Sequence, residues 1–215
     1  TDANSNVDST TATVTVLDTL NPTAVAQNIT VYLDASGSAS IVASDVDNGS
    51  TDNCSTVTLA IDSSNFDCSE VGANTVKLYV TDANSNVDST TATVTVLDTI
   101  KPTVITQPVT VYLDASGNAS IVIADVENGT TDNCGTPILT LSNSLFTCAD
   151  IGANTVQLIA TDVNGNVDSA SVVVTVSDTI KPTVITQPIT VYVDALGNAS
   201  IVIADVENGT TDNCG

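Results

Sequence analysis

Acidic and amide side chains alternate in a short segment that occurs three times, first at residues 2–8, and they are the residues best suited to chemistry in this chain. The pattern Asp-x-Asn-x-Asn-x-Asp comprises Asp82, Asn84, Asn86 and Asp88, and again Asp162, Asn164, Asn166 and Asp168. Calcium takes roughly six to eight oxygen ligands, and alternating Asp and Asn in a tight turn gather such oxygens. The pattern lacks the distant bidentate Glu of an EF-hand. The alternative is a plain hairpin turn, in which Asn, Asp and Gly tolerate left-handed conformations.

The cysteines follow a regular spacing. The interval from Cys54 to Cys68 equals that from Cys134 to Cys148, and Cys214 follows Cys134 at the same distance as Cys134 follows Cys54. One pair in each small β-unit predicts the disulfides Cys54–Cys68 and Cys134–Cys148, and with them an oxidising, extracellular compartment. The alternative is a pair of metal-binding thiols. It is disfavoured because the chain has neither a Cys-x-x-Cys segment nor a histidine.

The composition argues against several classes of function. The 25 acidic residues outnumber three lysines, so the formal net charge is −22, and neither Arg nor His is present. Nucleic acids and anionic membrane surfaces need cationic partners that this chain lacks. No apolar stretch approaches the roughly 18 residues of a membrane-spanning helix. Without His and Arg, the usual general base and the usual oxyanion or phosphate clamps are missing, and we expect no enzymatic activity.

Apolar and polar residues alternate through most of the chain, as in strands with one buried face. Between residues 99 and 178 this pattern predicts strands near 109–113, 121–124, 138–141, 145–148, 156–160 and 172–176. Turns are expected at 114–118 and 162–168, and a polar loop at 125–135. The expected fold class is all-β, a tandem array of immunoglobulin-like antiparallel β-sandwiches of about 80 residues each.

The sequence repeats itself with one fixed period. The segment 1–8 returns at 81–88 and, with small changes, at 161–168. We therefore expect residues 1–18 to end a preceding repeat, 19–98 and 99–178 to form two whole repeats, and 179–215 to begin a following one, all within a longer array. The junction from Asp98 to Pro102 has little slack, so neighbouring repeats should abut.

Carboxylates are expected to gather where one repeat meets the next. In an immunoglobulin-like sandwich, the loop with Asp125, Glu127 and Asp132 lies at the same pole as the turn 162–168, and the chain enters there with Asp98. The turn 34–37 of the preceding repeat should project toward that pole. Such acids repel one another unless a cation lies between them. We therefore predict a joint between repeats that is stiffened by Ca²⁺; the alternative is that these acids point separately into solvent.

The run from Gly152 to Asn166 resembles the G-x-x-x-V-x-x-x-A-T-D-x-x-G-N signature of hyalin-repeat (HYR) and related bacterial immunoglobulin-like modules. The Thr131–Cys134 loop and the Asp-Thr-Ile-Lys-Pro junction are similar to repeats of the SprB-type surface adhesins of gliding Bacteroidetes. The resemblance covers the whole chain. It implies a surface adhesin exported by the type IX secretion system. One departure is Ser85, which stands where the signature has its second glycine.

A three-residue pattern, Asp followed by Ser or Thr and then a small, aliphatic or Thr residue, is similar to the O-glycosylation motif of Bacteroidetes secreted proteins. It places candidate acceptors at Thr19, Ser89, Thr99, Ser169 and Thr179. In a chain so rich in Asp and Thr, the pattern also recurs by chance.

Together these features predict a mechanical role at the bacterial cell surface. We expect a structural segment of a large secreted adhesin filament, which extends an adhesive region from the cell for attachment or gliding motility. The expected partners are neighbouring repeats of the same chain and, through other regions, surface polysaccharide or another extracellular ligand and the outer-membrane motility or secretion machinery. Two alternatives stay open: a spacer array within a large secreted hydrolase, and a direct ligand-binding, lectin-like module.

Overall fold

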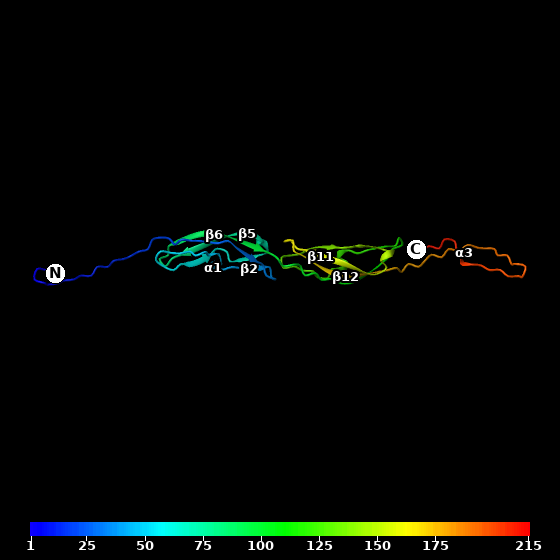
Figure 1. Cartoon of the computed structure of the whole chain (residues 1–215), viewed down its shortest axis with the longest axis horizontal. Coiled ribbons are helices and arrows are strands. Elements are labelled where there is room, and N and C mark those ends of the chain that lie inside the picture. Colours follow the sequence, from blue (N-terminus) through cyan, green and yellow to red (C-terminus); the bar gives the residue numbers. More distant parts are fainter. The chain divides into compact units, whose positions relative to one another are not determined.

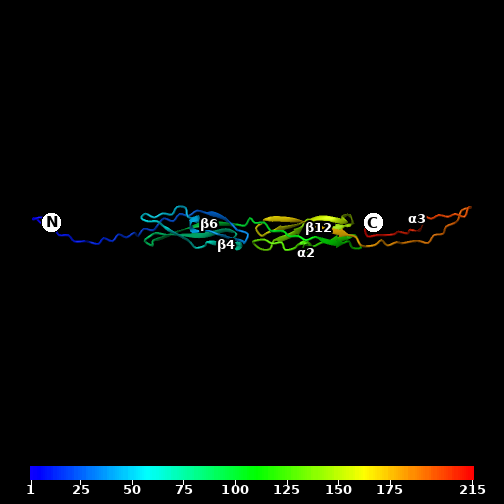
Figure 2. The ribbon, with the colours of Figure 1, turned by 90° about the horizontal axis from the view of Figure 1, so that it is seen from below.

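The computed structural model describes all 215 residues and divides them into two compact units, Thr1–Asp98 and Thr99–Gly215. Strands dominate both units, as Figures 1 and 2 show. None of the helices is both long and apolar enough to cross a membrane.

The first unit contains a four-stranded sheet and a two-stranded sheet. The large sheet has the order β1-β6-β5-β3, and β2 pairs with β4 in the small one. The strands are β1 (Ile29–Tyr32), β2 (Ser38–Ser40), β3 (Thr58–Ile61), β4 (Asn65–Asp67), β5 (Gly72–Thr81) and β6 (Val87–Leu97). A single helical turn, α1 (Ala43–Val46), and a 3₁₀ turn, η1 (Cys68–Glu70), complete the unit.

The second unit repeats this arrangement. Its large sheet has the order β7-β12-β11-β9, and β10 pairs with β8. The strands are β7 (Val109–Tyr112), β8 (Asn118–Ser120), β9 (Ile138–Leu141), β10 (Leu145–Thr147), β11 (Gly152–Thr161) and β12 (Val167–Ser177). The short helices are α2 (Ile123–Val126), η2 (Cys148–Asp150) and, within 179–215, α3 (Ile203–Val206).

Alternation of side chains along the long strands builds the core of each unit. Successive residues of a strand face opposite sides of the sheet, so every second residue can be buried. In β11 the buried residues are Val156, Leu158 and Ala160. Phe146 of β10, from the small sheet, belongs to the same hydrophobic core as residues of β12. The predicted fold class is confirmed: each unit is an immunoglobulin-like β-sandwich.

One strand pair in each large sheet departs from the predicted antiparallel arrangement. β1 runs parallel to β6, and β7 runs parallel to β12. Parallel neighbours need a long connection, and here the rest of the repeat provides it. The first and last strands of a repeat therefore lie side by side and point in the same direction.

The segment 121–124 was expected to be a strand, but its second half begins the helical turn α2. The Val122 amide donates to Asp125 Oδ2 at 2.7 Å, and the Asp125 amide donates to the Val122 carbonyl at 3.0 Å. Side-chain bonds of this kind compete with strand pairing for the backbone groups. The strand β8 accordingly ends at Ser120, before this turn.

Residues 179–215 correspond to the first part of a repeat, but they form less regular structure. Residues 189–192 occupy the position of β7 and are not a strand. β7 pairs with β12, and this segment contains no counterpart of β12. Apolar side chains at positions that are buried in the whole repeat are therefore exposed here: Val193 and Ile201 are exposed, whereas their counterparts Leu113 and Ile121 are buried.

Candidate functional site

Three aspartates of the first unit converge at one end of its sandwich. Asp18, Asp52 and Asp82 each place a carboxylate oxygen within 4.8 Å of the others. Asp18 lies on the chain segment that leads into the sandwich, Asp52 on the loop between α1 and β3, and Asp82 directly after β5. The fold thus brings together three carboxylates that are far apart in the sequence.

Asp82 is buried, and the turn that follows it satisfies both of its oxygens. Its Oδ1 accepts from the amides of Asn84 at 2.9 Å and Asn86 at 2.8 Å. Its Oδ2 accepts from the Asn86 side-chain amide at 2.8 Å. The same Asn86 amide donates to the Asp18 carbonyl at 3.2 Å, which ties the turn to the entering chain.

Asp18 and Asp52 each keep one carboxylate oxygen without a donor. Asp18 Oδ1 accepts from the Leu20 amide at 3.1 Å, and Asp52 Oδ2 accepts from the amides of Cys54 at 3.0 Å and Ser55 at 2.9 Å. These bonds fix the orientation of the two carboxylates. The opposite oxygens, Asp18 Oδ2 and Asp52 Oδ1, are buried and accept no hydrogen bond from a nitrogen or hydroxyl donor; the only group beside Asp18 that could donate is the weakly donating Cys54 thiol.

A hard divalent cation fits this set of donors. Buried polar atoms are nearly always partnered, and buried negative charge needs a counter-charge. Three carboxylates from separate segments suit Ca²⁺, which prefers oxygen ligands and tolerates irregular geometry. The two oxygens without donors make the strongest structural case for such an ion.

The electrostatics of the loop 52–55 favour an ionised ligand. The hydrogen bond from the Cys54 amide, helped by Ser55, holds the pKa of Asp52 below its ordinary value of 3.8. The carboxylate is therefore charged at neutral pH. Loss of hydration around the sulfur, followed by the charge of the adjacent Asp18 carboxylate, raises the pKa of the Cys54 thiol. A thiol is a weak donor, so its proximity does not replace a cation beside Asp18.

The same arrangement recurs with the sequence period. Asp132 and Asp162 of the second unit are the counterparts of Asp52 and Asp82, one period later in the sequence. Asp162 accepts from the amides of Asn164 and Asn166 at 2.9 and 2.7 Å, as Asp82 does from Asn84 and Asn86. Asp132 Oδ1 is again buried and without a hydrogen bond, and so is Asp212 Oδ1 in the segment 179–215.

The predicted metal ligands fall into three groups. Asp82 belongs to the cluster of the first unit, Asp132 and Asp162 are counterparts of its members in the second unit, and Asp98 is buried at the end of the first unit. Asn84, Asn86, Asn164 and Asn166 shape the turns around Asp82 and Asp162 through their backbone amides. The remaining four, Asp88, Asp125, Glu127 and Asp168, lie outside the clusters.

Three of those four residues have other partners. Asp88 Oδ2 accepts from the Ala24 amide at 3.0 Å, and Asp125 caps the start of α2. Glu127 Oε1 accepts from the amides of Gly129 and Thr130, both at 2.6 Å. Asp168 is exposed on β12. These side chains hold loops in place or face solvent.

Asp18 and Asp52 were not among the predicted ligands, although the sequence contains a signal for them. Asp18 stands one period before Asp98, and Asp52 stands one period before Asp132. Applying the repeat period to the predicted ligands would have identified both.

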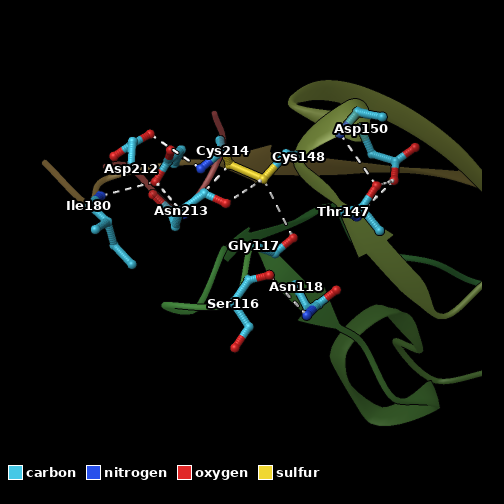
Figure 3. The surroundings of a disulfide bond; sticks show 12 residues. Ser116, Gly117, Asn118, Thr147, Cys148, Asp150, Ile180, Asp212, Asn213 and Cys214 are labelled. Atoms are coloured by element: carbon cyan, nitrogen blue, oxygen red, sulfur yellow. Dashed lines mark hydrogen bonds between the residues drawn. A yellow bond between two sulfur atoms is a disulfide. The ribbon is translucent and has the colours of Figure 1, made fainter. Parts of the chain in front are cut away.

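The disulfide pairing predicted from the regular cysteine spacing is wrong. Cys148 is bonded to Cys214, at a sequence separation of 66, with their Cα atoms 5.3 Å apart (Figure 3). Cys54 is a free thiol, so Cys54–Cys68 does not form either. Cys68 and Cys134 are also disulfide-bonded.

The geometry of β11 explains the error. Cys148 lies just before the first residue of β11, whereas Cys134 precedes β9, whose first residue pairs with the last residue of β11. The ten residues of β11 span about 30 Å, far beyond the roughly 7 Å that a disulfide bridges between Cα atoms. Two cysteines that are close in sequence therefore lie at opposite ends of one sandwich.

The predicted O-glycosylation sites differ in exposure. Thr19, Thr99, Ser169 and Thr179 are exposed, whereas Ser89 is half-buried on β6. Modification of these residues stays a prediction.

No family model and no curated protein matches the chain. Among solved structures, the chain is similar to repeats EC21–23 of human CDH23, at 15% identity over 90% of this chain and 80% of that one, with a TM-score of 0.45. The extracellular domain of protocadherin γB4 is 16% identical over 90% of this chain, with a TM-score of 0.38. An endo-fucoidan hydrolase of glycoside hydrolase family 107 is 16% identical over 81% of this chain, with a TM-score of 0.31.

The chain spans 38% of the protocadherin and 31% of the hydrolase. At these levels of similarity, no inference about activity or ligands passes from those proteins to this one.

Proposed function

We propose that this chain is a structural segment of an extracellular array of immunoglobulin-like repeats, in which Ca²⁺ bound by an aspartate cluster stiffens the entry to each repeat. The observation that carries the proposal is the pair of buried oxygens without donors, Asp18 Oδ2 and Asp52 Oδ1, beside Asp82. No pattern of solvent-exposed acids would leave such oxygens buried and close to one another.

The origin of the three ligands gives the cation a mechanical role. Asp18 comes from the segment 1–18, which corresponds in sequence to the end of a repeat, while Asp52 and Asp82 belong to the repeat 19–98. An ion held by all three ties the entering chain to the sandwich that follows. Without the ion, the like charges favour separation of these segments.

The disulfide supports an extracellular location for the chain. Disulfides form and persist in oxidising environments, so an extracellular location agrees with the Cys148–Cys214 bond. Calcium sites of extracellular modules typically bind with Kd values of about 10⁻⁴ to 10⁻³ M. A site built from three carboxylates and no complete ligand cage suits that range.

We propose more specifically that the array is part of a surface adhesin filament. The sequence resemblance to HYR-type repeats of gliding Bacteroidetes supports a bacterial cell-surface adhesin exported by the type IX system, with its binding partners contacted by other regions. In this proposal the chain itself is not an enzyme. A spacer array within a secreted hydrolase is the alternative, and the sequences that flank the array in its gene distinguish the two.

Calorimetric melting of the whole chain tests the calcium site. A ligand that binds only the folded state raises stability by about 2.7 kcal/mol when its concentration is roughly 100 times Kd. We expect Tm to rise by several degrees in millimolar Ca²⁺ relative to excess EDTA, and less in equal Mg²⁺, which demands stricter octahedral geometry. Superimposable melting curves in Ca²⁺ and EDTA would overturn the proposal.

A further inference from the structure

The loop Asp212-Asn213-Cys214 packs on a sandwich other than its own. It belongs to the segment 179–215, which corresponds to the start of a repeat, yet Cys214 is bonded to Cys148 of the repeat 99–178. Both cysteine side chains pack against the hydrophobic core of that repeat. The bond therefore joins two successive repeats and does not close a loop within one.

The repeat 99–178 offers this loop a socket, which we define as the turn Asp114–Asn118, Cys148 and Asp178. Figure 3 shows Gly117 of this turn and Cys148 beside Asn213 and Cys214. The Asn213 side-chain amide donates to the Asp114 carbonyl at 3.3 Å and to Asp178 Oδ1 at 3.2 Å. The Asn213 carbonyl lies 3.4 Å from Cys148 Sγ. Polar contacts thus position the loop beside the sulfur with which it bonds.

Gly117 makes room for the loop. Its φ of +74° is in the left-handed region, and a Cβ there would lie 2.6 Å from Cys148 Sγ and 2.8 Å from the Asn213 carbonyl oxygen. Gly197 is the corresponding residue one period later, with a similar φ of +82°, and nothing lies within 4 Å of a Cβ built there. Both glycines thus share the left-handed conformation, and only at Gly117 would a side chain also collide with neighbouring atoms.

The bond has a consequence for how tension passes along the chain. Between Cys148 and Cys214 lie both long strands, β11 and β12, and then residues 178–213 with the helical turn α3. A pulling force follows the shortest covalent path, which crosses the disulfide and bypasses this entire segment. The two strands that supply most of the core are then outside the path of tension.

We propose that the socket receives the Asp-Asn-Cys loop of the following repeat, and that the disulfide made there is a mechanical staple that shields β11 and β12 from force. The proposal rests on the structural role proposed above, and it adds the covalent route by which that role withstands tension. It does not depend on calcium.

The chain enclosed between Cys148 and Cys214 is long enough for its release to be measured. The bond spans a sequence separation of 66 residues, and an extended chain covers at most about 3.3–3.6 Å per residue. While the disulfide is intact, roughly 220–240 Å of chain is withheld from extension. A bond between Cys134 and Cys148 would instead withhold only about 50 Å.

Single-molecule stretching of the whole chain, with handles at both ends and no reductant, tests the staple. We expect the fully extended contour of Cys148→Ser/Cys214→Ser to exceed that of the native chain by roughly 220–240 Å. Cys54→Ser removes the free thiol and serves as the control, with an unchanged contour. Because the final contour depends on covalent connections, a variant that folds poorly still gives a valid measurement.

Equal contours for the double variant and the native chain would overturn the proposal, and so would an increase of only about 50 Å. Repeating the measurement in EDTA separates the two proposals. Contours that are independent of calcium are expected here, even if the melting experiment shows no calcium effect.

Discussion

At the scale of single residues, the two oxygens of a carboxylate in the aspartate cluster have different roles: one accepts backbone hydrogen bonds, and the other is available to a cation. Backbone amides hold Asp18 Oδ1 and Asp52 Oδ2, and the other oxygen of each residue is left for the cluster. The local bonds fix the direction of the charge before any ion arrives. Such preorganisation lowers the cost of binding, because the side chains are already ordered.

Replacing Asp52 by asparagine should have opposite effects with and without calcium. The introduced amide keeps an oxygen for the amides of Cys54 and Ser55, removes one negative charge, and turns a donor toward Asp18 Oδ2. We expect Tm in EDTA to rise above that of the native chain, and the increase in Tm caused by Ca²⁺ to fall to a small fraction of its native size. Calorimetry under both conditions measures both effects.

Asp62→Asn is the matched control for that variant. Asp62 accepts from the Lys77 amide at 2.8 Å and lies outside the clusters, and asparagine preserves this acceptor. The change in net charge is the same, so its calcium response should equal the native one. A full calcium response in Asp52→Asn would contradict the assignment of Asp52 as a ligand.

The turns after β5 and β11 provide a second comparison between residues. Ser85 has a φ of +72°, whereas Gly165, its counterpart, has a φ of +90°. A left-handed conformation costs a residue with a Cβ roughly 1–2 kcal/mol, and glycine loses roughly 0.5–1 kcal/mol in chain entropy. Ser85, which stands where the signature has glycine, therefore has a strained backbone conformation.

Exchanging these residues should shift stability in opposite directions. We expect Ser85→Gly to stabilise the chain by about 0.5–1 kcal/mol and Gly165→Ser to destabilise it by a similar amount. Guanidinium unfolding followed by circular dichroism measures both. Shifts of the same sign in the two variants would be inconsistent with relief of left-handed strain.

At the scale of elements, the turn Asp114–Asn118 and the loop 212–214 act as a socket and its occupant. The turn comes between β7 and β8, and the loop follows α3. Both elements are short and irregular. They fit together because Gly117 leaves space for the loop and because the Asn213 side-chain amide donates to the Asp114 carbonyl and to Asp178 Oδ1.

Gly117→Ala should prevent the disulfide from closing. The added methyl would occupy space beside Cys148 Sγ and the Asn213 carbonyl, and backbone atoms cannot move aside as a flexible side chain can. We expect a large fraction of Cys148 to react with an alkylating reagent, as measured by mass spectrometry of the native-state protein. In the native chain, Cys148 should be protected.

Gly197→Ala controls for the backbone strain alone. Its φ is similar, and a methyl there meets no atom within 4 Å. Cys148 should remain protected in this variant. Equal protection in both alanine variants would show that Gly117 is not needed for the close approach of the loop.

At the scale of the whole molecule, the dominant property is the formal net charge of −22. Many carboxylates are nevertheless stabilised in the charged form by local hydrogen bonds. The Ser36 hydroxyl lowers the pKa of Asp34, the Ser69 hydroxyl that of Asp67, and the Thr130 amide that of Glu127. These two effects predict opposite changes of folding stability in acid. Protonation removes the stabilising hydrogen bonds to the carboxylates, but it also reduces the repulsion among them.

We expect local bonding to dominate, so that stability falls in acid. A folded-state pKa below the ordinary value of 3.8 contributes stability that is present above that value and lost as pH falls through the folded-state pKa. Denaturation midpoints in calcium-free buffer should thus decrease below about pH 4. Increasing midpoints over the same range would mean that relief of charge repulsion outweighs these bonds.

Much of the fold was predictable because alternation and turn residues are local signals. The strands around 138–141, 156–160 and 172–176 are present in the structure. The helical turn α2 was missed because one carboxylate, Asp125, caps a backbone amide three residues earlier. The parallel pairing of β7 with β12 was also missed, since it joins the two ends of a repeat.

The sequence by itself determined the period, the all-β fold class, the turn that cradles Asp82 and the acidic character of the cluster. These depend on residues that are neighbours along the chain or on one face of a strand. Only the tertiary structure decided which carboxylates converge and which cysteines bond. The reason is physical: β11 separates Cys134 from Cys148 by about 30 Å, whereas the packing of 179–215 on the preceding sandwich brings Cys214 to Cys148.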